Sequence, residues 1–559
     1  MNGGVNKNIR FLNNKIQFVS SLMLFIVLTV GINAQVVSAE NGMVASAHPL
    51  ASEAGLEILK AGGNVVDAAI ASVLVLAVVE PYASGLGGGG FLTLQMRNAE
   101  PLTIDYRETA PMLTSPQNYY DEENKFKLIT DLGGASVGVP GVPSALSLLL
   151  NEYGTMSIDE LVKPAIRAAR NGFAVNKTMA DLILEEYGRV SHTPETEELF
   201  LVDGFPPEPG DTLFNKDLAL IFEDLAERGI ESFYSGELAD KIVRAVKTGG
   251  GSLCAEDLSS YKAKVKEPIV GYYKDFKIVS SAPPSGGGVH LIQLLNIIDA
   301  LNLTSLEHNS LEYLHLVAEA IKIVGLEKNE FMGDPDFVDV PVQKLINKDY
   351  AKLLASFISE KSVLSDSIFT QKKNYESGST THFSAVDKYG NIIALTQSIN
   401  LFFGSGITVP GTGIILNNHL GNFDPEDGNI NSIKPGKKPV SSIAPTIIYK
   451  DDKPFLTIGT PGGSRIIGAL AQILVNLIDY NMTLEEAISS PRIYSNSTKL
   501  HVEGGISNEI IAGLEALGHK IETHPELDKY FGGAQAVMIK EGKLYGYGDP
   551  RRGGVALGY

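Results

Sequence analysis

The pattern of apolar and polar positions divides the chain into helix-rich and strand-rich stretches. Residues 50–59 and 65–79 are apolar at helical spacing, and the second stretch is apolar on all sides, which predicts a fully buried helix. Residues 144–364 alternate helical patterns, including one predicted helix at 158–171, with short loops, whereas the chain after residue 380 consists of short β-branched runs with helices between them. Without repeats or a low-complexity linker, this order predicts two interleaved segments that share one core.

One predicted strand pair carries the candidate chemistry. Residues 378–387 read Gly-Ser-Thr-Thr-His-Phe-Ser-Ala-Val-Asp, and a second apolar run follows at 392–395. The break between the runs contains Gly and Asn, which predicts strand, hairpin, strand. Thr380 would then begin a strand directly after a flexible turn. Two adjacent threonines at a strand edge alone indicate only β-propensity.

A cut before Thr380 would give this residue a second function. The new α-amino group has an unperturbed pKa of ~7.7–8.0, so a neutral fraction exists near neutral pH. Such an amine can act as base for the hydroxyl of the same residue.

The N-terminal residues have the pattern of an export signal. Three basic residues precede an apolar core at 18–32, and small residues at 37–39 supply a cleavage site. The apolar core is shorter than the ~20 residues of a spanning helix, which favours a cleaved signal over a membrane anchor. We therefore predict a signal peptide over residues 1–39 and a secreted, periplasmic or cell-surface protein.

Composition excludes several functional classes. The formal net charge of −19 argues against a nucleic-acid partner, and 44% hydrophobic residues allow a large globular core. The lone Cys254 excludes an internal disulfide framework and a multi-cysteine zinc site. No metal-ligand spacing such as His-Glu-x-x-His occurs, so neither a metal nor a cofactor is expected.

The glycine-rich stretch at residues 85–90 matches the dinucleotide pattern G-x-G-x-x-G. That fingerprint needs a strand before the glycines and a helix after them. Here a predicted helix precedes the glycines and a predicted strand, residues 91–96, follows. The order is reversed, so these glycines are expected instead to let the backbone pack close to another segment.

The Thr-Thr-His-Phe-Ser stretch at 380–384 resembles the processing site of the γ-glutamyltransferases, which are members of the N-terminal-nucleophile hydrolases. The resemblance extends from about residue 41 to residue 559 and includes the glycine loop at 80–91. It implies an α+β fold, a four-layer αββα sandwich in which helices cover two stacked sheets.

The resemblance also implies self-cleavage between Ser379 and Thr380, begun by attack of the Thr380 hydroxyl on the Ser379 carbonyl. The products would be a large subunit, residues 40–379, and a small catalytic subunit, residues 380–559. These subunits would form a heterodimer that folds as one intertwined domain.

Catalytic roles follow from the same resemblance. Gly462 and Gly463 lie in a Gly-rich turn between a predicted strand and helix, where backbone N–H groups favour developing negative charge, and they would form the oxyanion hole. Ser398 stands where the family usually has a Thr whose hydroxyl bonds the nucleophile. Asn400 matches a residue that holds the substrate amine. Without the resemblance, the glycine turn is an ordinary strand-to-helix connection.

Arg107, within Tyr-Arg-Glu-Thr-Ala-Pro, corresponds to the family's carboxylate-binding Arg, and a guanidinium can hold a carboxylate with two hydrogen bonds. Ser441 and Ser442 match the Ser pair that holds the same carboxylate. Alone, an Arg beside a Glu is more often a surface pair, and a Pro-flanked Ser pair is usually a turn.

Two residues and one segment depart from the family pattern. Asn422 replaces the Asp that pairs with the substrate ammonium, His419 stands where Gln or Glu is usual, and residues 424–437 are short for a lid. The expected substrates are small γ-glutamyl compounds such as glutathione, with water or an amine or peptide as acceptor. The departures leave open a cephalosporin-acylase-like enzyme or a poly-γ-glutamate hydrolase. An inactive secreted binding protein is the alternative from another class.

Overall fold

The computed structural model describes residues 35–120, 131–364, 378–424, 426–496 and 498–559. The predicted signal core at 18–32 lies outside these residues. Among the described residues, no helix is both long and apolar enough to cross a bilayer. The strand β1 (Val37–Ala39) pairs with β20 (Lys543–Gly548), so the predicted signal boundary after Ala39 coincides with the end of a strand and stays a prediction.

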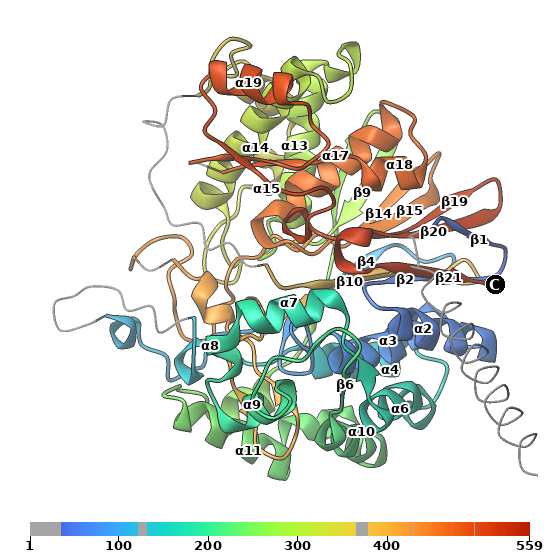
Figure 1. The fold of residues 1–559 in the computed structure, drawn as a ribbon, viewed down its shortest axis with the longest axis vertical. Coiled ribbons are helices and arrows are strands. Elements are labelled where there is room, and N and C mark those ends of the chain that lie inside the picture. The colour runs from blue at the N-terminus through green and yellow to red at the C-terminus, as the bar shows by residue number, and fades with distance from the viewer. Residues whose placement is uncertain (1–34, 121–130, 365–377, 425, 497) are drawn as a thin grey trace, which may run out of the picture.

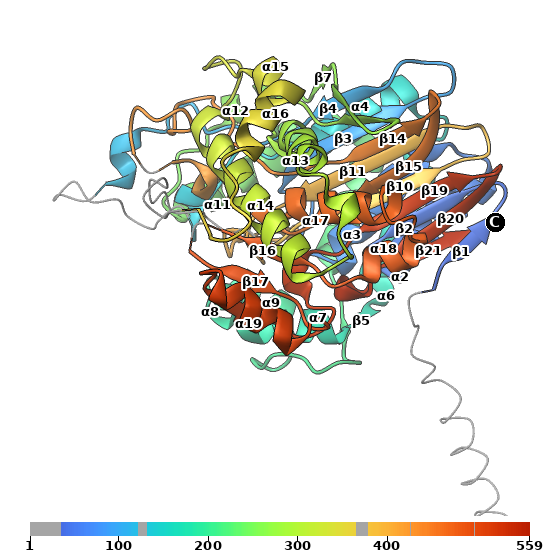
Figure 2. The same cartoon turned by 90° about the horizontal axis from the view of Figure 1, so that it is seen from above.

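Two seven-stranded sheets lie at the centre of the molecule (Figures 1 and 2). The first has the order β21 (Val555–Gly558), β2 (Met43–Ser46), β10 (Thr381–Val386), β11 (Ile392–Ser398), β3 (Gly89–Gln95), β4 (Leu102–Asp105), β7 (Lys264–Lys266). The second has the order β1, β20, β19 (Gln535–Lys540), β15 (Lys453–Gly459), β14 (Thr446–Lys450), β9 (Phe276–Ser280), β8 (Ile269–Tyr273). Each sheet contains strands from both sides of Thr380, so neither predicted segment can complete a sheet alone.

Helices cover the outer face of each sheet (Figure 1). On the side of the first sheet, α2 (Pro49–Ala61) and α3 (Val65–Val79) contact its strands. Behind them, α4 (Val142–Tyr153) and α6 (Lys163–Asn171) pack on α3, and α10 (Lys216–Arg228) and α11 (Gly236–Thr248) lie farther from the sheet. Against the second lie α13 (Gly287–Leu301), α14 (Leu311–Phe331) and α17 (Ile466–Ile478). The predicted four-layer αββα sandwich is confirmed.

Shorter elements complete the described chain. The helices are α5 (Ile158–Leu161), α7 (Lys177–Glu185), α8 (Tyr187–Val190), α9 (Pro194–Phe200), α12 (Ala255–Ser260), α15 (Val342–Leu345), α16 (Lys348–Ala355), α18 (Leu484–Ser489) and α19 (Asn508–Ala516). The small sheets are β5 (Phe173–Ala174) with β6 (Thr212–Leu213), β12 (Thr408–Val409) with β13 (Ile414–Ile415), and β16 (Ile493–Ser495) with β17 (Leu500–Val502) and β18 (Ile521–Thr523).

The alternation of side chains along β10 explains the layers. Phe383 and Ala385 face the helical core around α3, whose residues are all buried, as predicted. Val386 instead joins the core between the two sheets, where it meets Val279 and Val537 of the second sheet. A strand with alternate side chains in two cores is held in register, because a slip of one residue would exchange the two faces.

The predicted hairpin between β10 and β11 is confirmed. Asp387 closes it, because one carboxylate oxygen accepts from the backbone N–H groups of Tyr389 and Asn391 at 2.9 and 3.0 Å. Its other oxygen accepts from the Val65 N–H at 3.0 Å, at the start of α3. The turn residue therefore also docks the hairpin on the buried helix.

The glycine loop packs as predicted. A Cβ on Gly88 would overlap the carbonyl oxygen of Ser398, and one on Gly90 would overlap that of Thr396. The loop therefore sets the end of β11 directly against the start of β3, where only glycine fits. One predicted helix, residues 158–171, is wrong in detail: it breaks at Val162 into α5 and α6, and Pro164 lies in the first turn of α6.

Candidate active site

Thr380 lies immediately before β10 and is buried, as is Ser379. The backbone N–H of Ser379 donates to the Asn400 carbonyl at 3.2 Å. Its side-chain hydroxyl lies 3.1 Å from the carbonyl oxygens of both Tyr82 and Ala83, just after α3. Ser379, on the N-terminal side of the candidate cleavage site, is thus anchored by both its backbone and its side chain.

Two hydroxyl groups meet the carbonyl oxygen of Ser379. Ser398 Oγ donates to it at 2.6 Å, and Thr380 Oγ1 donates to it as well. The backbone N–H of Asn400 donates to Ser398 Oγ at 2.8 Å, which orients the Ser398 hydroxyl toward the carbonyl. The sequence predicted that the Ser398 hydroxyl bonds the nucleophile; in the uncut chain it polarises the carbonyl that the nucleophile would attack.

Most of the predicted site residues line one small cavity of about 70 Å³. Seven predicted residues line it: Arg107, Thr380, Ser398, Asn422, Ser441, Ser442 and Gly463. Its other lining residues are Lys328, His419, Val440, Ile443, Ser464 and Ile466. Gly462 and Asn400 are not among the lining residues. The Asn400 side-chain amide donates to the Asn418 carbonyl at 3.0 Å, so it braces the neighbouring loop.

Arg107 enters the cavity from the segment after β4. Its guanidinium donates to the carbonyls of Pro439 and Val440, both at 3.2 Å, which ties it to the chain that carries the Ser pair. Its Nη1 lies 3.5 Å from Glu108 Oε2. Burial is the largest effect on this guanidinium and lowers its pKa, but Arg stays charged throughout the physiological range.

Glu108 also holds His419. His419 Nδ1 lies 2.8 Å from Glu108 Oε1, and both side chains are buried. Burial, together with the charge of Arg107, lowers the pKa of His419 to about 4. The imidazole is therefore neutral at physiological pH and donates its Nδ1–H to Glu108 Oε1. Because His419 carries no charge, Arg107 is the cationic partner of the Glu108 carboxylate in this group.

Lys328 is a site residue that the sequence did not predict. It lies in the last turn of α14 and lines the same cavity as Arg107. Burial, and to a smaller extent the charge of Arg107, lowers the pKa of Lys328 to about 8. Nothing local marks this Lys, because a basic residue in the last turn of a helix is ordinary.

The candidate oxyanion turn joins β15 to α17. Gly462 and Gly463 have φ angles of 136° and 59°, which favour glycine, and Gly463 begins a 3₁₀ turn (Gly463–Arg465). Two aromatic residues brace this turn: the Tyr494 hydroxyl lies 2.9 Å from Ser464 Oγ, and the Arg465 guanidinium lies over the Tyr530 ring at 4.3 Å.

His382, although close to Thr380 in sequence, has a structural position. Its ring nitrogens lie 2.6 Å from Thr396 Oγ1 and 2.9 Å from Ser384 Oγ. Burial lowers its pKa to about 3, so the ring stays neutral, and a Cβ on Gly459 of the second sheet would overlap it. His382 fills the space between the sheets.

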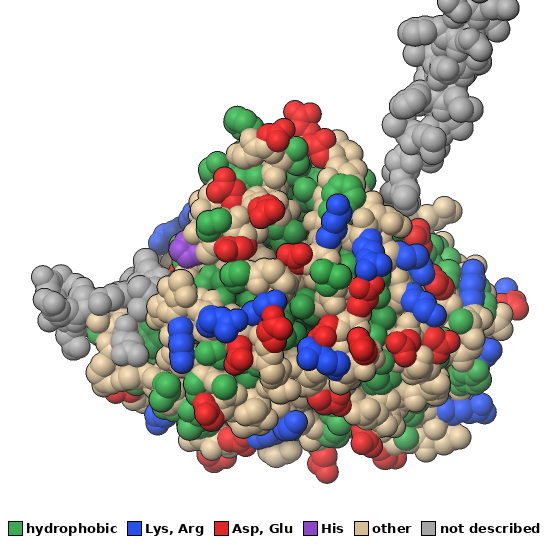
Figure 3. All heavy atoms as spheres, turned by 90° about the horizontal axis from the view of Figure 1, so that it is seen from below, with side chains coloured by type: hydrophobic (Ala, Val, Ile, Leu, Met, Phe, Trp, Pro, Cys, Tyr) green, Lys and Arg blue, Asp and Glu red, His purple; other side chains and the backbone are tan. Residues whose placement is uncertain are grey.

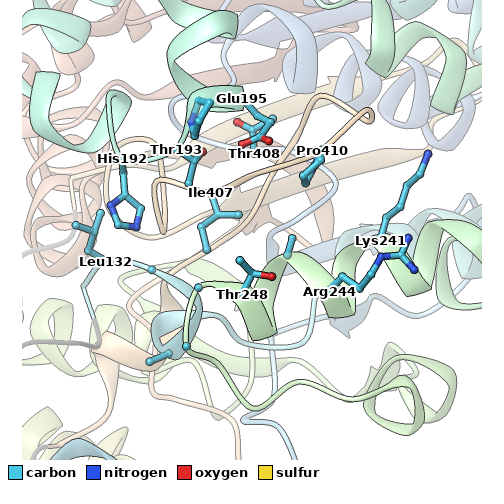
Figure 4. A pocket seen from close by; sticks show the side chains of 16 residues that line it. Leu132, His192, Thr193, Glu195, Lys241, Arg244, Thr248, Ile407, Thr408 and Pro410 are labelled. Atoms are coloured by element: carbon cyan, nitrogen blue, oxygen red, sulfur yellow. The ribbon is translucent and has the colours of Figure 1, made fainter.

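A second hollow of about 1,250 Å³ lies on the helical side of the first sheet (Figure 4). Lys241 and Arg244 of α11 and Glu195 of α9 contribute its charged side chains. Its lining contains none of the predicted site residues. The face shown in Figure 3 mixes acidic, basic and apolar side chains.

Comparison with known proteins identifies the family. The sequence matches the family described as Gamma-glutamyltranspeptidase over residues 51–559. The chain belongs to this family. It is 39% identical to the glutathione hydrolase proenzyme of Escherichia coli (strain K12), over 92% of this chain and 91% of that protein. It is 38% identical to the glutathione hydrolase proenzyme of Bacillus subtilis (strain 168), over 94% and 92%.

A solved structure supports the same family and fold. The crystal structure of cephalosporin acylase from Bacillus halodurans superposes with a TM-score of 0.84 at 30% identity, covering 95% of this chain and 98% of that one. Proteins described as glutathione hydrolases and a protein described as a cephalosporin acylase are thus both similar to this chain.

Proposed function

We propose that this chain is an exported, self-processed γ-glutamyl hydrolase and acyltransferase that uses Thr380 as nucleophile. The observation that carries the proposal is the single cavity that Thr380 shares with Arg107, the Ser441–Ser442 pair and Gly463, which come from four separate stretches of the chain. A nucleophile, a carboxylate-binding group and oxyanion donors are what an acyl transfer needs in one place.

Activation would begin with the uncut chain. Thr380 Oγ attacks the Ser379 carbonyl carbon, the C–N bond breaks, and the hydroxyl proton passes to the departing Thr380 nitrogen. Water then hydrolyses the resulting ester, leaving a carboxylate on Ser379 and a free amine and hydroxyl on Thr380. Ser398 Oγ, at 2.6 Å from the attacked carbonyl oxygen, stabilises its developing charge.

Turnover would reuse the same hydroxyl. The α-amine of Thr380 takes the hydroxyl proton as Oγ attacks the γ-carbonyl of the donor, and passes it to the leaving amine. The backbone N–H groups of Gly462 and Gly463 donate hydrogen bonds to the oxyanion, and each stabilises the transition state by ~2.7–4 kcal/mol. Arg107 and the Ser441–Ser442 pair hold the donor carboxylate. Water then releases the acyl group, or an amine or peptide accepts it.

The two products of the cut would remain together as a heterodimer. Strand β10, after the cut, lies between β2 and β11, and β11 pairs with β3. Separation would expose the buried cores of both sheets. The relatives' description as proenzymes supports such processing. No cofactor takes part in this scheme.

The test is release of the chromophore from a γ-glutamyl anilide. Wild-type protein should release it, and Thr380→Ala, prepared in parallel, should not. Activity retained by the Thr380→Ala protein would contradict the role of this residue.

One specific observation favours a second candidate, an amidase for acyl groups with a carboxylate but no ammonium. Among the described residues that line the cavity none is acidic, whereas Arg107 and Lys328 bring two positive charges. Asn422 cannot form an ion pair with an ammonium. A glutaryl anilide and a γ-glutamyl anilide differ only in that ammonium, so the ratio of their kcat/KM values decides between the two candidates.

A further inference from the structure

A second cluster of chemically active side chains lies on the small sheet β16–β17–β18. Strands β17 and β18 are parallel, and their register places His501 beside Glu522. His524 lies two residues beyond Glu522 and therefore on the same face, and its backbone N–H donates to the Val502 carbonyl at 2.9 Å. Strand pairing thus brings together two imidazoles and a carboxylate that are far apart in the sequence.

Three potential ligand atoms of this cluster converge on one point. His501 Nδ1 and His524 Nε2 are 3.1 Å apart, and Glu522 Oε1 is 4.0 Å from the first and 3.9 Å from the second. Ligands at ~2.0–2.2 Å from a tetrahedral Zn²⁺ lie about 3.3–3.5 Å from one another. Shifts of less than 1 Å would therefore bring the three atoms to zinc-binding distances.

The surroundings suit a cation at this point. Glu522 uses its other oxygen, Oε2, for Lys499 Nζ at 2.6 Å, which leaves Oε1 directed toward the imidazoles. His524 Nδ1, on the far side of its ring, lies 3.7 Å from Asp528 Oδ2. A carboxylate behind a ligating His orients the ring and raises its basicity.

Two close ring nitrogens need either a proton or a cation between them. Without a metal, one N–H bridges His501 Nδ1 and His524 Nε2; a divalent ion would replace that proton and release it to solvent. His501 would then carry its proton on Nε2, which lies 3.4 Å from the Asn496 side-chain nitrogen. This contact between two donors is a local cost of binding.

The cluster is connected to the candidate oxyanion turn through Tyr530. The Tyr530 ring stacks on His524 with centroids 4.5 Å apart and lies 4.7 Å from that of His501. The guanidinium of Arg465, which lies two residues after Gly463, stacks over the same Tyr530 ring at 4.3 Å from its centroid. An ion that fixes the two imidazoles would also fix this aromatic support.

We propose that His501, Glu522 and His524 form a binding site for one divalent transition-metal ion of the Zn²⁺ class, which braces the Tyr530 side of the oxyanion turn. Two nitrogens and one carboxylate oxygen are the donor set that Zn²⁺ accepts, with a fourth position left for water. Local motif searches miss the site because one ligand comes from β17 and the other two from β18 and the residue just after it.

The test measures zinc directly. Wild-type protein, stripped with a chelator, reloaded with ZnCl₂ and dialysed, should retain one zinc per chain by elemental mass spectrometry and should melt at a higher temperature than the stripped protein. Glu522→Gln and His524→Gln should each lower zinc affinity by at least about tenfold. Asn496→Asp, which offers His501 Nε2–H an acceptor, should raise affinity by about tenfold.

Controls separate this site from other effects. His192→Gln removes an exposed imidazole elsewhere and should leave zinc retention unchanged. The Thr380→Ala chain should bind zinc as wild type does, so a failure of the proposed nucleophile would not affect this result. Wild-type protein without retained zinc, or Glu522→Gln and His524→Gln proteins that retain as much as wild type, would overturn the proposal.

Discussion

Replacement of Ser398 by Ala tests how the chain would cut itself. In the described part of the structure the Ser379 carbonyl oxygen accepts from the hydroxyls of Thr380 and Ser398. Thr380 gives up its proton as it attacks, so its hydroxyl cannot stabilise the oxyanion that forms. Ser398, at 2.6 Å and oriented by the Asn400 N–H, is the side-chain donor that remains.

The expected effect follows from the loss of one oxyanion donor. Such a loss costs ~2.7–4 kcal/mol, or about 10²–10³ in rate. Ser398→Ala should therefore slow cleavage by about that factor. Ser398→Thr keeps a hydroxyl on the same Cβ and should cleave at close to the wild-type rate.

The assay is a time course of precursor synthesised in a cell-free system, with the fragment that starts at Thr380 quantified on gels. Ser136→Ala is a matched control, because Ser136 is also buried and its hydroxyl donates at 2.6 Å to a backbone carbonyl, that of Gly133. It should cleave like wild type. Circular dichroism should show that the Ser398→Ala protein is folded. If its cleavage rate is nevertheless within about threefold of the wild-type rate, Ser398 is not the donor to the oxyanion.

Two further predictions concern the acyl pocket. Asn422→Asp should raise kcat/KM for donors with a free α-ammonium and lower it for a glutaryl anilide, because the new carboxylate can pair with the ammonium; unchanged donor preference refutes this account of the pocket. The pKa of Lys328 is lowered to about 8, so the Lys is charged below that pH and neutral above it. The KM for carboxylate-bearing donors should therefore rise as pH increases through about 8 in wild type, and Lys328→Gln should show a higher KM without this step. A pH profile of KM that is identical in both proteins would remove Lys328 from donor binding.

The sequence predicted the buried helix, the hairpin and the position of Thr380 just before a strand because the relevant signals are local. The alternation after Thr380, the uniformly apolar stretch of α3 and the Gly turn before α17 each determine one element and its position. Predicted helix 158–171 failed in detail at Pro164, where an apolar periodicity continues through a residue that favours the start of a new helix.

The residues that sequence reasoning missed or misplaced depend on long-range packing. Lys328 reaches the cavity because α14 packs on α13, which in turn covers the second sheet, and nothing in its sequence neighbours indicates this. The partner of the Ser398 hydroxyl depends on the register of β10 and β11, in which Thr381 faces Gln397 and the Ser379 carbonyl comes within reach of Ser398. His501 and Glu522 become neighbours through the register of β17 and β18. In each case tertiary structure decides which side chains meet.

The proposed mechanism requires that Thr380 becomes an N-terminal residue and then carries the acyl group. Intact-mass spectrometry of the purified, active enzyme tests it most directly, together with N-terminal sequencing of its fragments. We expect two chains, the smaller beginning at Thr380 and gaining the mass of the acyl group when a γ-glutamyl donor is trapped on it. A single uncut polypeptide with full activity would contradict it.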